Sequence, residues 1–142
     1  MTTHILGFTY KPKIVGVRDG YIRQTIRTSN SKRPKKVGDD LLLHDWKDRP
    51  YFSDWSWRRR EVITELIPIR ISIRGFHYLS FADIPLPDYV WENVGFSLWD
   101  CPNADRVAAR DGIVPPTGLE LKKVLLHYAG KKTPIRMDII RW

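Results

Sequence analysis

The sequence contains very few residues that could cross-link the chain or hold a metal ion. Cys101 is the only cysteine, which excludes an internal disulfide. The four histidines are scattered and give no HxxxH or CxxC spacing, so the pattern predicts no structural zinc site. We therefore expect no metal and no cofactor, and we interpret Cys101 as a small, half-buried side chain.

Long apolar runs are missing as well. No run approaches the roughly 18 residues that a membrane-spanning helix needs. The N-terminus lacks the charged and then apolar segments of a secretory signal. These absences predict a cytoplasmic protein without a membrane partner.

Acidic residues are too few to balance the basic ones. The chain has 24 Lys and Arg against 16 Asp and Glu, which gives a net charge of +8. This excess favours a polyanionic partner, and nucleic acid is the commonest one. The alternative is that the charge serves solubility alone.

The size and the hydrophobic content of the chain fit one globular domain. The chain has 142 residues, of which 42% are hydrophobic, so a single domain over residues 1–142 can bury a core of its own. Alternating or β-branched runs predict strands at residues 4–10, 21–27, 41–43, 61–73 and 134–142. Helical spacing and capping residues predict helices at residues 12–18, 103–112 and 115–130. Because strand–helix units do not alternate, we predict an α+β fold: a small, mostly antiparallel β-barrel with short flanking helices.

The stretch DGYIRQTIR (residues 19–27) combines a strand pattern with polar side chains. Side chains alternate along a strand, so Arg23, Thr25 and Arg27 are predicted to share one face. If that face lines a cleft, an arginine can grip a phosphate or a base edge with two hydrogen bonds. The alternative is a solvated face on which Arg27 bridges structural carbonyls or Asp111.

A loop rich in positive charge follows at residues 28–36. Its basic residues after the strand are Lys32, Arg33, Lys35 and Lys36. Such a loop could clamp a phosphate backbone, which gives affinity without sequence information. A loop that is merely solvated is the alternative.

Aromatic and basic residues are interleaved in RPYFSDWSWRRR (residues 49–60). Aromatic rings stack on unpaired bases with about 1–3 kcal/mol each, and arginines neutralise phosphates. The predicted nucleic-acid contacts here are Arg49, Tyr51, Trp55, Trp57, Arg58 and Arg59. The alternative is that tryptophans plug one end of the fold, with one of Trp55 and Trp57 in the core.

These stretches together resemble the ASCH domain family of the PUA-like superfamily of small β-barrels. GYIRQTIR, the basic loop and KVGDDLLL resemble its strand ending in Thr/Ser-x-Arg and its Val-Gly-Asp turn. The matching positions are Gly20, Thr25, Arg27, Val37, Gly38 and Asp39. ARDGI, ELKKVLLHYAG and PIRMDIIRW resemble the two closing helices and the last strand, with Asp111 where the family has a glutamate. The resemblance covers nearly the whole chain and is weakest from residue 75 to 100.

The resemblance implies a function that involves RNA, either binding or, in some members, hydrolysis. One bacterial branch deacetylates N4-acetylcytidine with a lysine, a threonine and a glutamate. Thr25 and Asp111 stand at two of these positions and are the candidate catalytic residues. Ile22 stands at the lysine position, and an isoleucine cannot activate a threonine hydroxyl. We therefore predict binding of RNA, another single-stranded nucleic acid or a nucleotide, with Thr25, Arg27 and Asp111 at the centre of the cleft.

Two alternatives remain open. A hydrolase of the same fold would be a ribonuclease or an N4-acetylcytidine amidohydrolase, although no histidine pair and no carboxylate cluster supports nuclease chemistry. A protein-interaction module would have an exposed aromatic patch and a binding affinity that hardly depends on salt.

Overall fold

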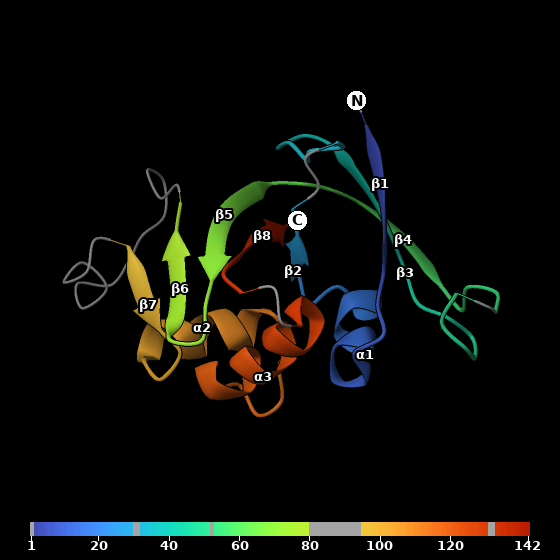
Figure 1. The fold of residues 1–142 in the computed structure, drawn as a ribbon. Helices are drawn as coiled ribbons and strands as arrows, with labels where there is room; N and C mark the ends of the chain where they lie inside the picture. The colour runs from blue at the N-terminus through green and yellow to red at the C-terminus, as the bar shows by residue number, and fades with distance from the viewer. Residues whose placement is uncertain (1, 30–31, 52, 80–94, 131–132) are drawn as a thin grey trace.

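The computed structural model describes residues 2–29, 32–51, 53–79, 95–130 and 133–142 (Figure 1). Within these ranges the strands are β1 (Thr3–Gly7), β2 (Gln24–Thr28), β3 (Asp40–His44), β4 (Arg58–Val62), β5 (Glu65–Ile71), β6 (Gly75–Tyr78), β7 (Phe96–Leu98) and β8 (Ile135–Arg141). The helices are α1 (Lys11–Asp19), α2 (Pro102–Arg110) and α3 (Gly118–Ala129). Figure 1 shows the helices gathered along one side of the strands.

The strands form two sheets. One has the order β1-β3-β4 and the other has the order β2-β8-β5-β6-β7. Among the described strands, only β1 and β3 pair in parallel, and the remaining pairs are antiparallel. Only Ile63 and Thr64 separate β4 from β5, so the chain passes directly from the first sheet to the second along the arch in Figure 1. The predicted α+β class is confirmed, whereas the described strands form these two sheets and no closed barrel.

The helix boundaries follow local capping signals. Pro12 lies in the first turn of α1, and Gly20 ends the helix in the left-handed conformation with φ 87°. Thr117 caps α3, because its side-chain oxygen accepts a hydrogen bond from the N–H of Glu120 at 3.2 Å. The helix predicted at residues 103–112 is α2, which begins at Pro102 and ends at Arg110. Cys101 occupies its N-cap position in an extended conformation, without a side-chain capping hydrogen bond.

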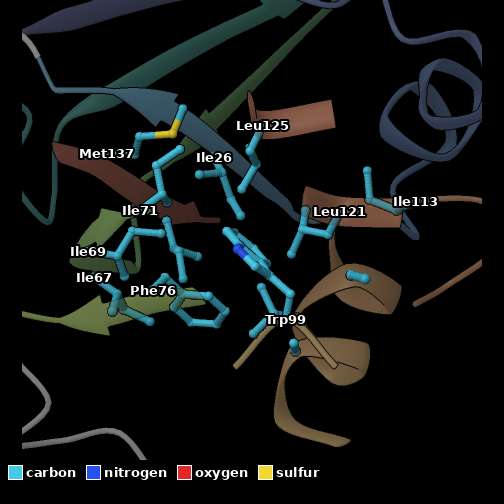
Figure 2. Close-up of a cluster of buried hydrophobic side chains, with 14 of the residues drawn as sticks. Ile26, Ile67, Ile69, Ile71, Phe76, Trp99, Ile113, Leu121, Leu125 and Met137 are labelled. Atoms are coloured by element: carbon cyan, nitrogen blue, oxygen red, sulfur yellow. The ribbon is translucent and has the colours of Figure 1, made fainter. Parts of the chain in front are cut away.

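The larger core lies between the second sheet and the helices α2 and α3. Figure 2 shows its side chains converging on Trp99, which is 2% exposed and donates its Nε1 hydrogen to the carbonyl of Ser72 at 2.8 Å. Its aliphatic members on β5 and β8 are Ile67, Ile69, Ile71, Met137 and Ile139. β-Branched residues on a pleated surface pack well against helices, which explains why these strands bury this face.

A second core packs the first sheet against α1. Its members are Leu6, Phe8, Val17, Leu41, Leu43, Ile63, Ile140 and Trp142. Met137 and Ile139 belong to the first core and Ile140 belongs to the second, so β8 is buried on both sides. β8 therefore couples the two halves of the molecule.

Two strands at sheet edges come together beside α1. β1 pairs only with β3, and β2 pairs only with β8, within the described part of the chain. The side chain of Arg27 on β2 donates from Nη2 to the carbonyl of Gly7 at the end of β1 at 2.7 Å. An arginine thus links the two edges at the place where the chain enters α1.

Candidate functional site

A cavity of about 390 Å³ lies where the end of β1, α1, β2 and α3 meet. Its charged lining residues are Lys13, Arg27 and Asp111, and Thr25 is one of the hydroxyl residues beside them. Its aromatic lining residues are Phe8, Tyr10, Tyr51 and Tyr128. Small-molecule sites are typically hollows of about 300–1,000 Å³ with apolar walls and a few convergent polar groups. In volume and in lining, this cavity has the character of a ligand site.

Lys13 and Asp111 form a buried ion pair at the wall of the cavity. The Nζ atom of Lys13 lies 3.1 Å from Oδ2 of Asp111, and the two side chains are 5% and 6% exposed. The side-chain amide of Gln24 donates from Nε2 to Oδ1 of Asp111 at 3.3 Å and to the carbonyl of Val107 at 3.2 Å. The carboxylate of Asp111 is therefore held through both of its oxygens.

Helix ends place this pair. Lys13 lies in the first turn of α1, which follows the end of β1 after a short connection. Asp111 directly follows the last residue of α2, where its backbone N–H donates to Val107 at 3.0 Å. Gly112 then turns the chain in the left-handed conformation with φ 77°. The pair thus joins two helices that are far apart in the sequence.

Burial pushes both members of the pair toward their neutral forms. Desolvation raises the pKa of Asp111, and the attraction of Lys13 opposes this increase. Desolvation also lowers the pKa of Lys13; Asp111 opposes this change, and Arg27 adds to it by repulsion. Ionisable groups shifted in this way, inside a cavity, are typical of functional sites.

Thr25 and Arg27 line the neighbouring wall from β2. The Nε atom of Arg27 donates to Oγ1 of Thr25 at 3.2 Å, and its Nη2 donates to the carbonyl of Gly7. The guanidinium group lies 4.8 Å from the centre of the Phe8 ring, within the range of a cation–π contact. Thr25 is only 3% exposed. β2 therefore presents a hydroxyl group and a guanidinium group to the cavity, as its sequence pattern predicts.

An aromatic cluster stands beside the cavity. The rings of His44 and Trp55 stack at 3.7 Å, and Trp46 contacts both of them edge to face. The guanidinium group of Arg58 lies 4.7 Å from the centre of the Trp55 ring. Tyr51 contacts Trp46 at 5.1 Å and lines the cavity, yet it is 80% exposed. The cluster thus extends from the protein interior to an exposed ring at the cavity.

The backbone holds Tyr51 in an unusual conformation. Its φ is 67°, the only positive value among the described residues other than glycine. A bulky residue rarely adopts this conformation without support from its surroundings, and such residues concentrate at functional sites. Trp57, in contrast, is partly buried and packs against the second core without belonging to it. Arg49 is exposed on the same segment.

The cavity brings together Thr25, Arg27, Tyr51 and Asp111, four residues that the sequence singles out. Asp111 pairs with Lys13. Arg27 instead donates to the carbonyl of Gly7, which agrees with the alternative that it bridges structural carbonyls. Lys13 is closer because α1 carries it to the C-terminal end of α2.

Arg23 does not share the cavity, so its predicted place beside Thr25 and Arg27 is wrong. Its Nε atom donates to the carbonyl of Trp142 at 2.7 Å, and its Nη2 lies 3.6 Å from Glu61. It lines a second hollow of about 320 Å³ instead. Arg59 also contacts Glu61, with its Nε 2.7 Å from the carboxylate. Both arginines therefore have partners within the fold.

The basic side chains of the loop do not line the cavity. Lys32, Arg33 and Lys36 are exposed and Lys35 is half-buried, and none of the four lines the cavity. Arg33 donates to the carbonyl of Thr3 at 3.2 Å, which ties this loop to the outer edge of β1. A phosphate-binding role for the loop stays a prediction.

Sequence reasoning missed Lys13 and Gln24. A lysine is normally expected at the protein surface, so the residue type of Lys13 does not predict a place in a buried site. The helical spacing of α1 could have indicated that Lys13 is buried, because residues three and four positions apart share one helix face. Gly16 and Val17 lie on that face and are also buried. Ile22 stands at the family's lysine position, but Lys13 brings a lysine to the cavity from α1.

The site can recognise a polar ligand on several sides. Lys13 and Arg27 donate hydrogen bonds, the carboxylate of Asp111 accepts them, and the hydroxyl of Thr25 does both. The lining of Tyr10, Tyr51 and Tyr128 adds rings that can contact a flat ligand. No group of three or more His, Cys, Asp or Glu in the described ranges could hold a metal ion.

Comparisons with known proteins give no relative: the chain matches no family model, no curated protein and no solved structure. Among the residues that the structure describes, no helix is long and apolar enough to span a membrane.

Proposed function

We propose that the protein binds RNA or another single-stranded nucleic acid and takes one nucleotide into the cavity. The observation that carries this proposal is the convergence of Lys13, Thr25, Arg27 and Asp111 in a cavity that Tyr51 borders. A base edge offers donors and acceptors together, and this set of side chains can satisfy both. Recognition of RNA commonly uses splayed-out bases that stack on aromatic rings.

The resemblance to ASCH domains supports the same proposal. We propose that the two sheets correspond to an ASCH-like, PUA-like barrel and that the protein acts in the cytoplasm on RNA. The net charge of +8 favours a polyanion, and the exposed Arg49 and Arg58 lie on the segment that carries Tyr51. These arginines and the basic loop would neutralise phosphates outside the cavity.

The proposal is tested by fluorescence-anisotropy titrations of short single-stranded RNA, duplex RNA and single-stranded DNA in a series of salt concentrations. We expect single strands to bind more tightly than the duplex, with affinity falling steeply as salt rises. Tyr51→Ala should weaken binding by about 5- to 150-fold, the loss of one base-stacking contact. Tyr21→Ala is the matched control, because Tyr21 is 68% exposed and does not line the cavity. An absence of binding at low salt, or equal losses in the two variants, would refute the proposal.

A hydrolase acting on a modified nucleoside is the second candidate, and Lys13 favours it. Lys13 lines the same cavity as Thr25 and Asp111, and burial lowers its pKa. A neutral lysine amine can accept the proton of a threonine hydroxyl as that hydroxyl attacks an acyl carbon. The resulting acyl-threonine ester would then be hydrolysed by water, which releases the acid and regenerates the hydroxyl.

This candidate is tested by incubating the protein with N4-acetylcytidine and with RNA. Chromatography would detect cytidine and acetate, and a denaturing gel would detect cleaved RNA. If the protein is an amidohydrolase, Lys13→Met and Thr25→Val should both abolish release of acetate, and Lys11→Met, at an exposed position of α1, should not. Intact substrates with the wild-type protein would leave binding as the function.

A further inference from the structure

The charges that line the cavity do not balance. Lys13 and Asp111 neutralise each other across 3.1 Å. Arg27 adds a second positive charge, and within the described ranges no carboxylate lies within 4.0 Å of it. The side-chain charges of the cavity therefore sum to one positive charge.

Arg27 has contacts, but all of them are with neutral groups. Its hydrogen-bond acceptors are the hydroxyl of Thr25 and the carbonyl of Gly7, and its planar face lies over Phe8. Desolvation lowers the pKa of Arg27, and the attraction of the Asp111 carboxylate opposes this change without cancelling it. An arginine nevertheless stays protonated in proteins. The site therefore holds a partly desolvated cation that has no carboxylate in direct contact among the described residues.

The geometry of a guanidinium group indicates which partner would fit. Arginine has five N–H donors in a planar fork, and the fold uses Nε and Nη2 of Arg27. Both acceptors are neutral, so the group retains its capacity for a charge-assisted hydrogen bond. Such bonds to phosphate are about twice as strong as bonds between neutral groups.

We propose that Arg27 binds the phosphate of the nucleotide that occupies the cavity. The ligand class is then a nucleotide with at least one negative charge on its phosphate, and an uncharged nucleoside is a poor ligand. This inference rests on the proposed function and makes it narrower. The phosphate can be the monoester of a free nucleotide or a diester within a strand, since both offer anionic oxygens to the same fork.

Calorimetric titration of the wild-type protein tests the inference without a variant. The probes are the four ribonucleosides, their 5′- and 3′-monophosphates, the dinucleotide CpC and inorganic phosphate. We expect at least one monophosphate, or CpC, to bind at least tenfold more tightly than the corresponding nucleoside at low salt. Preference for a monophosphate indicates a free nucleotide or a strand end, and preference for CpC indicates an internal nucleotide. Equal affinities for nucleoside and phosphorylated probes would overturn the inference.

Variants assign the effect to Arg27. Arg27→Gln should remove the preference for phosphate, so that a phosphorylated probe binds no more tightly than its own nucleoside, while Arg27→Lys should retain part of the preference. Arg70→Gln is the control, because Arg70 is an exposed arginine on β5 that does not line the cavity. A phosphate preference that survives in Arg27→Gln would refute the assignment even if the other variants behave as expected.

The two proposals fail in different ways. If single-stranded RNA and nucleosides bind but phosphate adds nothing, the role of Arg27 is wrong and the proposed function stands. If neither single-stranded RNA nor any mononucleotide binds at low salt, both are wrong.

Discussion

Removing either member of the Lys13–Asp111 pair should destabilise the protein, and the two losses should depend on pH in opposite directions. Breaking a buried ion pair by removing one partner typically costs about 3–5 kcal/mol, because the other charge is left buried. In Lys13→Met the remaining group is the carboxyl of Asp111, and in Asp111→Asn it is the ammonium group of Lys13. Each of these two remaining groups can reduce the loss of folding free energy by becoming neutral: the carboxylate gains a proton and the ammonium group loses one.

The expected loss of stability follows from the free energy needed to make the remaining group neutral at pH 7. The ordinary pKa of an aspartate is 3.8, so keeping Asp111 protonated in the folded state at pH 7 costs about 4 kcal/mol relative to the unfolded chain. The ordinary pKa of a lysine is 10.5, so keeping Lys13 neutral at pH 7 costs about 5 kcal/mol. These values are the upper limits of the charge-related loss of stability in Lys13→Met and Asp111→Asn at neutral pH.

The signs follow from proton binding. Burial raises the pKa of Asp111, so folded Lys13→Met holds a proton that the unfolded chain releases above pH 3.8. Its stability should therefore increase by up to about 1.4 kcal/mol for each unit that the pH falls from 7 toward 4. Burial lowers the pKa of Lys13, so folded Asp111→Asn lacks a proton that the unfolded chain retains below pH 10.5. Its stability should increase by a similar amount for each unit that the pH rises from 7 toward 10.

Urea denaturation followed by tryptophan fluorescence measures these free energies, since Trp99 and Trp142 are both buried. The double variant Lys13→Met/Asp111→Asn is the reference, because it has neither charge. We expect it to unfold within about 1 kcal/mol of the wild type at pH 7, as buried ion pairs are often replaced by neutral groups without loss. Parallel pH dependences of the two single variants, relative to the double variant, would refute the reasoning.

Substitutions at three further positions test the fold. Thr117→Ala should lower the free energy of unfolding by about 1 kcal/mol through loss of the α3 cap, and Thr117→Ser should not; equal losses would contradict a capping role. Gly118→Ala should destabilise by about 1–3 kcal/mol or more, because its new Cβ would meet the carbonyl of Trp99. Gly38→Ala should cost only the strain of its left-handed backbone, about 1–2 kcal/mol, since no other atom lies within 4 Å of the position. Urea denaturation measures both effects. A larger decrease in the free energy of unfolding for Gly38→Ala than for Gly118→Ala would contradict this assignment of steric overlap to Gly118 and backbone strain to Gly38.

Elements marked by local chemistry could be predicted from the sequence. α1 can be predicted because Pro12 and Gly20 are local signals. Pro12 favours the start of a helix in its own turn, and Gly20 favours the end of a helix at its own position. The strand preference of the β-branched run near residues 61–73 is equally local, although the structure divides that run between β4 and β5. The arrangement of the strands could not be predicted in the same way. The parallel pairing of β1 with β3 depends on packing against α1, and no residue of either strand signals it.

The same distinction separates the parts of the site. Thr25 and Arg27 were predicted together because they alternate within one strand, which fixes their common face. The same alternation also predicts Arg23 on the face of Thr25 and Arg27. β2 begins at Gln24, however, so Arg23 lies outside the strand and the alternation of side chains does not apply to it. The partner of Asp111 could not be predicted, because it depends on how α1 packs against the end of α2.

The pairing of β2 with β8 has a consequence for the order in which the protein acquires its properties during synthesis. Gln24 lies opposite Arg141, and Thr28 lies opposite Met137, so the strand that carries Thr25 and Arg27 pairs with a segment made more than a hundred residues later. Contacts between such distant segments close large loops and form slowly. A nascent chain that lacks β8 also lacks the strand that joins the two cores. We therefore expect the emerging protein to be unable to bind its ligand until Ile135–Arg141 has left the ribosome.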